Sequence, residues 1–292
     1  MTAGQRFREA LAQNKPLQIV GTINAYQALQ ATKVGHKALY LSGAGVANAS
    51  YGLPDLGMTN LEEVCIDVRR ICAICPTPLI VDADTGFGHA LNIGRCVIEL
   101  IRNGAAGMHL EDQVGAKRCG HRPNKEIVET QEMCDRLHVA LEARKIDPSF
   151  YLIARTDARA KEGLESAIER ALSYAKTGVD AIFAEALQNL EEYHAFSQAL
   201  SVPLLANITE FGLTPMFGLE ELKSVGVAMV LYPLSAFRAM NKVALSVYAD
   251  LKYKGTQKDQ IPHMQTREEL YEMLGYYGYE AQMDLLLGHQ KS

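Results

Sequence analysis

Several features that mark other classes of protein are missing from this chain of 292 residues. No apolar run approaches the length that a helix needs to cross a bilayer, so we expect no membrane partner. Residues 1–20 contain neither an uninterrupted apolar core nor a small-residue cleavage site, so we expect a cytoplasmic protein. Basic residues form no stripe and the net charge is −5, which argues against nucleic acid as the main partner.

A disulfide framework is also not expected. Six cysteines in a chain of this length, without a secretion signal, indicate reduced thiols. Cys72 and Cys75 have the spacing of redox or metal-binding pairs, but they close an amphipathic helical stretch, and no second pair completes a zinc site. We interpret them as cysteines that pack one face of a helix.

Short apolar runs alternate with longer amphipathic ones along the whole chain. The expected strands are β-branched or aliphatic and apolar on both faces, as buried parallel strands are. They are residues 17–24, 38–43, 78–84, 107–112, 150–157, 181–186, 203–209 and 228–233. Several helical patterns between them end on glycine, the usual C-terminal stop. Eight such units in about 230 residues predict a (β/α)8 TIM barrel, class α/β.

A doubly wound open sheet is the alternative, but residues 21–29 lack the G-x-G-x-x-G loop expected in its first turn. No linker or low-complexity tract interrupts the sequence, so we predict one barrel domain over residues 1–292 with a C-terminal helical extension at about 256–292. Residues 266–288 are helical and apolar enough to require a partner surface, either on the barrel or on a neighbouring subunit.

Polar residues gather where the expected strands end. They are Asn24, Ser42, Asp82, Asp84, Glu111, Asp112, Arg155, Asp157, Glu185, Asn207 and Thr209. In a parallel barrel the carboxyl ends of all strands meet at one face, where active sites form. We therefore expect these side chains to converge on a single pocket.

Asp82 and Asp84 would share a strand face because strand side chains alternate. With Asp55 and Glu111 available nearby, such carboxylates suit a hard cation such as Mg²⁺. The alternative is a hydrogen-bonded pair that shapes the following turn. His109 lies within an apolar strand, and we interpret it as a core histidine.

Arg155, Arg238 and Arg267 offer guanidinium groups that bind carboxylates in a bidentate manner. Arg155 ends a strand, which favours a functional role, whereas the other two lie in helical patterns where solvated charges are the default. Asn207 and Thr209 share one strand face and could orient carboxylate oxygens, or simply end the strand.

Cys119 lies in the stretch EDQVGAKRCGHRPN, residues 111–124, among cationic side chains and between two glycines. Such surroundings lower the pKa of a thiol and expose it, unlike those of an inert structural cysteine. Cys119 and His121 are too close in sequence to form the nucleophile and base of a protease triad easily. An acid–base role beside a metal and carboxylate-binding cations fits better.

Several motifs occur in order along the chain. They are DADTGFG (82–88), HLED (109–112), KRCGH (117–121), ARTDA (154–158), ANITEFG (206–212), LYPLSAFRAMN (231–241) and MQTREELYE (264–272). Through them the chain resembles, from about residue 17 to its tail, the 2-methylisocitrate lyase branch of the isocitrate lyase / phosphoenolpyruvate mutase superfamily.

The resemblance implies a Mg²⁺-dependent lyase, with Mn²⁺ as the alternative metal, that cleaves the tricarboxylate 2-methylisocitrate to pyruvate and succinate in the methylcitrate cycle of propionate catabolism. It implies a barrel whose last helix is exchanged between the subunits of a homotetramer. Asp82 and Asp84 match the metal carboxylates, and Asp55 and Glu111 match the surrounding cage.

Cys119 matches the catalytic thiol on a loop that closes over substrate, where it would protonate the carbanion left by carbon–carbon cleavage. Arg155 would stabilise the substrate alkoxide together with the metal, and Tyr40 is a candidate for removing the hydroxyl proton. The positions that match substrate-binding residues are Ser42, Gly43, Ala44, Cys119, Gly120, Arg155, Glu185, Asn207, Ile208, Thr209, Arg238 and Arg267.

Four alternatives stay open, and one of them is another 2-alkylmalate or 2-oxo acid lyase of the same superfamily. Isocitrate lyases share the cysteine loop, but they are longer and carry a tryptophan just after the Ser-Gly pair, whereas this chain has no tryptophan. Phosphoenolpyruvate mutases lack the cysteine motif. A non-catalytic barrel that binds a 2-oxo acid or a metal would have no need of Cys119.

Overall fold

The computed structural model describes residues 1–118, 120–121 and 125–287. The chain divides into two compact units, Met1–Phe237 and Arg238–Ser292.

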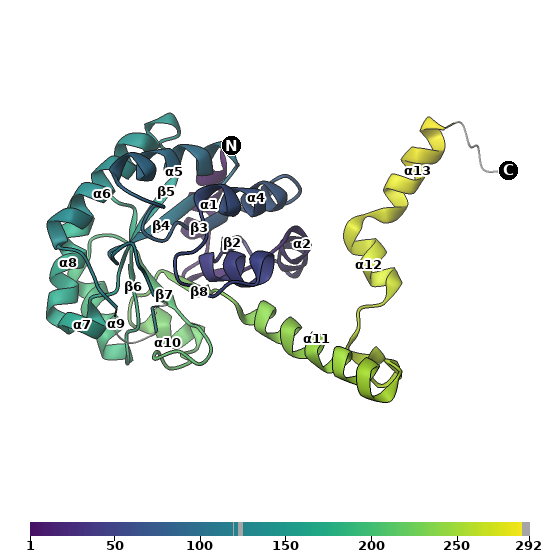
Figure 1. The fold of residues 1–292 in the computed structure, drawn as a ribbon. Coiled ribbons are helices and arrows are strands. Elements are labelled where there is room, and N and C mark those ends of the chain that lie inside the picture. Colours follow the sequence, from purple (N-terminus) through teal and green to yellow (C-terminus); the bar gives the residue numbers. More distant parts are fainter. Residues whose placement is uncertain (119, 122–124, 288–292) are drawn as a thin grey trace. The chain divides into compact units, whose positions relative to one another are not determined.

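In the described residues of the first unit, eight parallel strands close into a barrel in sequence order (Figure 1). The strands are β1 (Leu17–Gly21), β2 (Ala38–Leu41), β3 (Leu79–Asp82), β4 (Gly107–Glu111), β5 (Tyr151–Thr156), β6 (Ala181–Ala184), β7 (Leu204–Asn207) and β8 (Met229–Tyr232). Pairing between Leu17 of β1 and Met229 of β8 closes the ring. The predicted (β/α)8 barrel is confirmed.

Helices connect the strands and form the outer layer (Figure 1). They are α1 (Ala3–Gln13), α2 (Ala25–Val34), α3 (Gly43–Gly45), α4 (Leu61–Cys72), α5 (Ala90–Arg102), α6 (Thr130–Ala143), α7 (Arg159–Glu162), α8 (Leu164–Lys176), α9 (Leu190–Ala199) and α10 (Leu219–Ser224), with short turns η1 (Val46–Ser50) and η2 (Arg144–Ile146). Short sequence motifs determine where these helices begin and end. Asn60 and Glu63 form a capping box at the start of α4, and Gly35 ends α2 at φ 110°.

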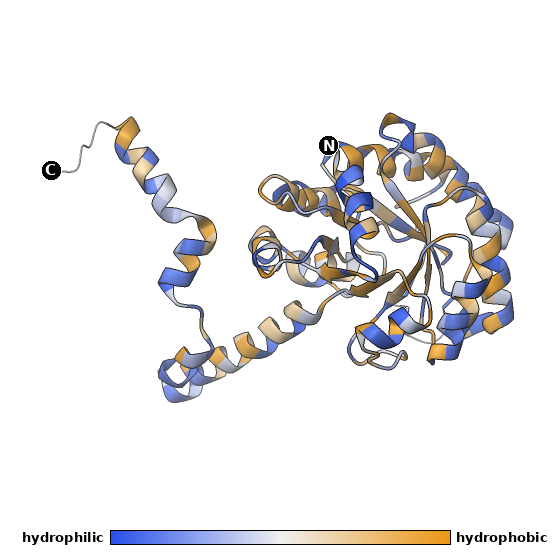
Figure 2. Cartoon of the chain, turned by 180° about the vertical axis from the view of Figure 1, so that it is seen from behind, coloured by the Kyte–Doolittle hydropathy of each residue, from blue (hydrophilic) through white to orange (hydrophobic). Residues whose placement is uncertain are grey.

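Two apolar clusters hold the barrel together. Leu39 and Leu41 of β2 belong to a cluster that includes the buried faces of the helices, so they point outward from the barrel. The alternate residues, such as Ile19 and Ile80, belong to a second cluster made almost entirely of strand residues, which fills the interior. Figure 2 shows the strands as predominantly hydrophobic.

Helix α1 contributes to the amino-terminal end of the barrel interior. Its residues Phe7 and Ala10 belong to the interior cluster, and the Phe7 ring lies 4.8 Å from the ring of Tyr151, the first residue of β5. The apolar filling is thus concentrated toward the amino ends of the strands. Polar inward-facing residues appear toward the carboxyl ends.

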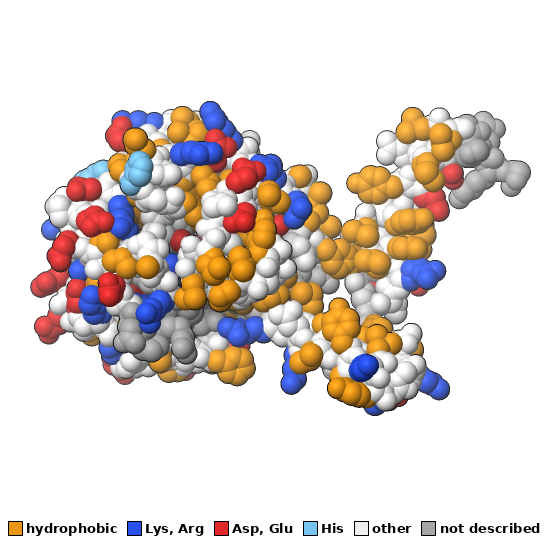
Figure 3. All heavy atoms as spheres, in the orientation of Figure 1, with side chains coloured by type: hydrophobic (Ala, Val, Ile, Leu, Met, Phe, Trp, Pro, Cys, Tyr) orange, Lys and Arg blue, Asp and Glu red, His pale blue; other side chains and the backbone are white. Residues whose placement is uncertain are grey.

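The second unit is helical. It contains most of α11 (Ser235–Lys254), then η3 (Lys258–His263), α12 (Arg267–Leu274) and α13 (Tyr276–Leu286). No described residue of these four elements is buried. Large hydrophobic side chains such as Tyr253, Tyr279 and Leu285 are exposed, and Figure 3 shows hydrophobic side chains along this unit. Across the described part of the chain, no helix combines the length and the hydropathy required to span a membrane.

The five described cysteines are free thiols, in agreement with the expectation of reduced cysteines. Cys72 ends α4 and is half-buried, while Cys75 is buried beside Thr32 and the carbonyl of Ala28. Burial raises the pKa of Cys72 to about 12, which makes the thiol unreactive near neutral pH.

We predict that Gly107→Ala lowers stability by about 1–3 kcal/mol, because a Cβ there would overlap the Tyr151 carbonyl oxygen and lie 2.7 Å from the Tyr151 Cβ. Gly94→Ala is the matched control. Gly94 lies within helix α5, and its added Cβ would stand 3.6 Å from Val139 of α6, so this substitution should stabilise the protein by about 0.5–1 kcal/mol. Urea unfolding midpoints measure both, and equal midpoints for the two variants would contradict the packing described here.

Candidate active site

Polar side chains replace the apolar filling at the carboxyl ends of the strands. The buried inward-facing members of this group are Tyr40, Asp82, His109, Glu111, Arg155, Glu185 and Asn207. Strand pairing brings them together, because Asp82 lies opposite His109 and Glu111 lies opposite Arg155. Residues more than 160 positions apart in the sequence therefore meet at one end of the barrel.

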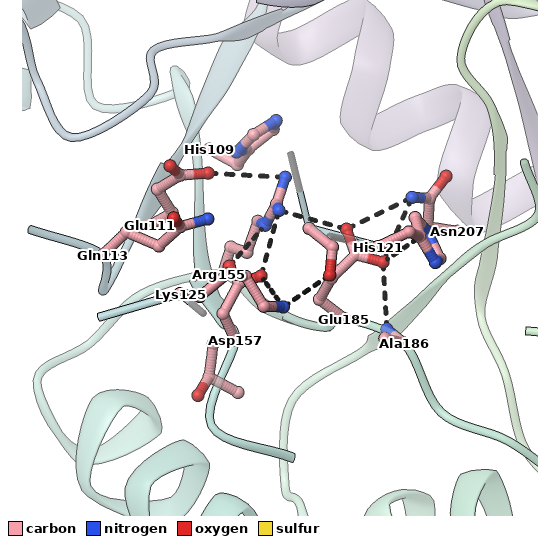
Figure 4. Close-up of polar contacts among 12 residues, drawn as sticks. His109, Glu111, Gln113, His121, Lys125, Arg155, Asp157, Glu185, Ala186 and Asn207 are labelled. Carbon is pink, nitrogen blue, oxygen red and sulfur yellow. Dashed lines mark hydrogen bonds and ion pairs between the residues drawn. The ribbon is translucent and has the colours of Figure 1, made fainter. Parts of the chain in front are cut away.

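The guanidinium of Arg155 is the centre of this group (Figure 4). It donates to Asp157 through Nε at 3.0 Å and Nη2 at 3.3 Å, and Nη2 lies 3.2 Å from Glu185 Oε2. Its Nη1 lies 3.4 Å from Glu111 Oε2. The guanidinium carbon stands 5.0 Å from the ring centre of Phe183, within the range of a cation–π contact.

Glu185 joins the Arg155 group to β7 and to the loop after β4. Its carboxylate accepts from Asn207 Nδ2 at 3.3 Å and from the backbone N–H of Ala186 at 2.9 Å, and it lies 3.0 Å from His121 Nε2. Burial opposes ionisation of Glu185, but the charge of Arg155 and then the hydrogen bond from His121 hold its pKa below the ordinary value. Glu185 is therefore an anion at neutral pH.

A second group lies on the β2–β3 side. Asp82 accepts from the backbone N–H of Gly43 at 3.0 Å and of Asp84 at 3.1 Å. The Lys117 ammonium lies 2.5 Å from Asp84 Oδ1 and 2.6 Å from Asp55 Oδ1. A cavity of about 470 Å³ opens beside Asp84 and Lys117.

Asp84 does not follow the strand geometry that the sequence predicted. Strand β3 ends at Asp82, and Asp84 has φ 48°, in the left-handed region. Both carboxylates still approach the same point, since a Cβ built on Gly43 would lie 3.1 Å from Asp84 Oδ1 and 3.2 Å from Asp82 Oδ2. The two side chains converge through a turn and not through alternation along a strand.

Burial opposes the ionisation of two carboxyl groups in this region, Asp84 and Glu111. Burial, followed by the charge of Asp82, raises the pKa of Asp84 to about 7, and Lys117 only partly offsets this. Burial also raises the pKa of Glu111, whose Oε1 is buried without a hydrogen-bond partner. Within the described ranges, no three His, Cys, Asp or Glu side chains form a ready-made metal cluster. The carboxylate oxygens nonetheless fit Mg²⁺, which binds through one or two carboxylates and keeps several water ligands.

Tyr40 and His109 lie deeper in the barrel. Their Oη and Nε2 atoms are joined by a hydrogen bond of 2.7 Å, and His109 Nε2 lies 3.4 Å from Asp82 Oδ1. Burial lowers the pKa of His109 to about 4, so this imidazole is neutral near pH 7. Burial and then the charge of Asp82 raise the pKa of Tyr40, and the base role of Tyr40 stays a prediction.

The sequence profile of the family described as phosphoenolpyruvate phosphomutase matches residues 7–252. The chain belongs to this family. Two curated relatives named 2-methylisocitrate lyase, from Salmonella typhimurium (strain LT2) and Escherichia coli (strain K12), are each 56% identical to it, over 99% of the chain and 98% and 97% of their own lengths. At this similarity the chain is an enzyme of the carbon–carbon lyase class.

Solved structures of the phosphoenolpyruvate mutase / isocitrate lyase superfamily share the fold. A 2,3-dimethylmalate lyase superposes with a TM-score of 0.89 at 31% identity, covering 99% of this chain and 96% of its own. A phosphonopyruvate hydrolase in complex with oxalate and Mg²⁺ superposes with a TM-score of 0.84 at 27% identity. The match covers 96% of this chain and 98% of the hydrolase chain.

The remaining residues that the family resemblance singled out are placed as follows. Ser42 is buried, Ile208 donates its N–H to the Leu231 carbonyl at 2.9 Å, and Thr209 is buried. A Cβ on Gly120 would lie 2.6 Å from Glu185 Cγ, so this glycine packs against the Arg155 group.

The remaining predicted positions are Ala44, Cys119, Arg238 and Arg267. Ala44 is half-buried in helix α3. Cys119 lies outside the described residues. Arg238 and Arg267 belong to the second unit, whose position relative to the barrel is not determined. Their predicted roles in substrate binding stay predictions.

Sequence analysis overlooked the buried residues Gln113 and Lys125 and the partners of Lys117. Lys125 donates to Asp157 at 2.6 Å, and Gln113 bonds to the backbone of Arg118. A lysine and a glutamine in a polar loop look like solvated side chains, so no local signal distinguishes them. These two side chains become buried only because the loop folds back onto the carboxyl ends of the strands.

We predict that Arg155→Gln destabilises the fold by about 3–5 kcal/mol, because it leaves buried carboxylates without their counter-ion. Arg102→Gln removes an exposed ion pair with Glu99 and serves as the control, with an expected change within about 1 kcal/mol. Urea unfolding of both variants tests this. If the two variants lost similar amounts of unfolding free energy, the ion pairs of Arg155 would contribute little to stability.

Proposed function

We propose that this enzyme cleaves 2-methylisocitrate to pyruvate and succinate, as a step of the methylcitrate cycle in propionate catabolism. The observation that carries the proposal is the 55–56% identity, over nearly the full length, to curated relatives named 2-methylisocitrate lyase. The buried cations at the carboxyl end of the barrel agree with a substrate that bears three carboxylates.

Arg155 is the residue best placed to bind the 2-oxo acid half of the substrate. It is buried and already lies against three carboxylates, so its charge is held in a fixed position. An anionic substrate oxygen could take one of these donor positions without moving the guanidinium, which is the preorganisation that stabilises developing negative charge. Asn207 and Glu185 lie beside it and can orient the same ligand.

The proposed metal is Mg²⁺, with Mn²⁺ as the alternative. Asp82 and Asp84 would hold it directly, and Asp55 and Glu111 would lie around it. The buried carboxylate oxygens support this, as does the Mg²⁺ complex of the structurally similar phosphonopyruvate hydrolase. When bound, the ion would supply Lewis-acid stabilisation of the negative charge that develops on the substrate oxygen.

Cys119 is proposed as the general acid. Cleavage of the carbon–carbon bond leaves an electron pair on the carbon that becomes part of succinate, and a proton delivered to that carbon completes the product. The KRCGH motif supports this role, because Lys117 and His121 on either side are held by buried carboxylates. The Lys117 ammonium would stabilise the thiolate that remains.

A homotetramer in the cytoplasm is proposed as the working form. Helices α11, α12 and α13 bury none of their described residues, and their exposed tyrosine and leucine side chains form the kind of apolar surface that another subunit covers. Exchange of the last helix between subunits would provide that cover.

The substrate proposal predicts a kcat/KM on 2-methylisocitrate about 10- to 200-fold above that on isocitrate, the discrimination that one methyl group gives in a fitted pocket. Release of pyruvate from 2-methylisocitrate and of glyoxylate from isocitrate, measured with the same enzyme preparation, gives the two kcat/KM values. A higher kcat/KM on isocitrate would reassign the chain to isocitrate cleavage. Absence of turnover on both would favour a binding protein of the same fold.

Removal of the metal is predicted to abolish turnover, and added Mg²⁺ should restore it. Asp84→Asn should weaken Mg²⁺ binding, measured by calorimetry, by at least about 10-fold, because it removes a charged oxygen from the proposed first shell. Asp135→Asn, on the exposed side of α6 beside Gln131, is the matched control and should bind normally. Full activity in excess chelator, with no metal retained, would refute the metal assignment.

A further inference from the structure

The loop that carries Cys119 leaves the barrel after β4 and returns before α6. An antiparallel bridge between Gln113 and Ile127 closes its base. Backbone hydrogen bonds from Val114 to Glu126 at 3.0 Å and from Val128 to Asp112 at 2.8 Å reinforce the bridge. The two ends of the loop are thus fixed to each other, close to the end of β4.

Gln113 reaches from this base to the residue that precedes Cys119. Its side-chain Nε2 donates to the carbonyl of Arg118 at 2.9 Å, and its Oε1 accepts from the N–H of Arg118 at 2.9 Å. Gln113 is fully buried, and its own carbonyl accepts from Arg136 at 2.9 Å. One amide side chain therefore holds both backbone polar groups of Arg118, as a neighbouring strand would.

Lys125 holds the residue that follows Cys119. Its ammonium donates to the carbonyl of Gly120 at 2.5 Å and to Asp157 Oδ1 at 2.6 Å. Asp157 is in turn bonded by Arg155, and its N–H donates to Asp112 at 2.9 Å. Lys125 thus ties the backbone at Gly120 to the Arg155 group.

We propose that Gln113 and Lys125 are positioning residues for the reaction, because they clamp the backbone of Arg118 and Gly120, the described residues on either side of position 119. The proposal rests on the proposed role of Cys119 as general acid. Lys125 reaches the Arg155 group through Asp157, and both side chains, the two clamps, bond to backbone groups of residues adjacent to position 119. A proton donor displaced by about 1 Å can lose about 100-fold in rate, so fixing this backbone has a kinetic consequence.

The first test compares Gln113→Met and Lys125→Met with two matched controls, Gln131→Met and Lys145→Met, whose side chains make exposed contacts on and after α6. We expect each clamp variant to lose about 10- to 100-fold in kcat with KM within about threefold. The controls should match wild type. Lys125→Arg keeps a cation that can reach the Gly120 carbonyl, and it should recover part of the loss.

The second test repeats both clamp variants in a Cys119→Ser background. Cys119→Ser alone should lower kcat by about 10²- to 10⁴-fold. If the clamps act through the thiol, adding either of them to Cys119→Ser should cause little further loss. Losses that multiply would overturn the proposal, whereas wild-type kcat in Cys119→Ser would instead refute the proposed acid.

A third measurement needs no substrate. Arg118 is exposed, but a protease must draw its backbone N–H and carbonyl into an extended conformation, and Gln113 holds both. Native-state tryptic cleavage after Arg118, followed by mass spectrometry of the fragments, should be at least several-fold faster in Gln113→Met and Lys125→Met than in the controls.

Gln113→Glu replaces Gln113→Met if the latter fails to fold. It keeps the size of the side chain and the acceptor for the Arg118 N–H but loses the donor to the Arg118 carbonyl, so cleavage should again be faster than in the controls. Cleavage at the wild-type rate in the folded clamp variants would overturn the proposal, whatever the activity of the enzyme.

Discussion

The buried guanidinium of Arg155 is the interaction on which the rest of the site depends. Arg155 comes from β5, and it neutralises carboxylates that follow or end three neighbouring strands, Glu111, Asp157 and Glu185. Those carboxylates hold further groups in turn, since Asp157 binds Lys125 and Glu185 binds Asn207 and His121. One planar cation with five donors can organise such an arrangement, and a lysine at this position could not.

The barrel makes this concentration of charge possible. Charged groups that are withdrawn from water require partners with good geometry, and a closed parallel sheet supplies them from adjacent strands in fixed register. The apolar interior toward the amino ends of the strands stabilises the fold, so the carboxyl ends can carry polar residues. Lys117, Asp84 and Asp55 form a second charged group beside β3, with a cavity next to it.

The barrel and the location of its polar end could be predicted from the sequence. The eight apolar runs have the length and composition of buried parallel strands, and polar residues such as Arg155 and Asn207 stand at their carboxyl ends. Asp84 shows the limit of this reasoning, because alternation was the wrong basis for its orientation and the turn at φ 48° determines it. Gln113 and Lys125 could not be found either, since their burial depends on how a polar loop folds back.

The left-handed backbone at Asp84 has a consequence for how this enzyme can evolve. A non-glycine residue in that region costs about 1 kcal/mol or more, so position 84 works against the stability of the fold. In a related barrel that did not need this carboxylate, substitution of position 84 by glycine would be favoured, because glycine adopts the left-handed region freely. An aspartate there is what we would expect if the proposed metal-binding role of this carboxylate outweighs its cost in stability.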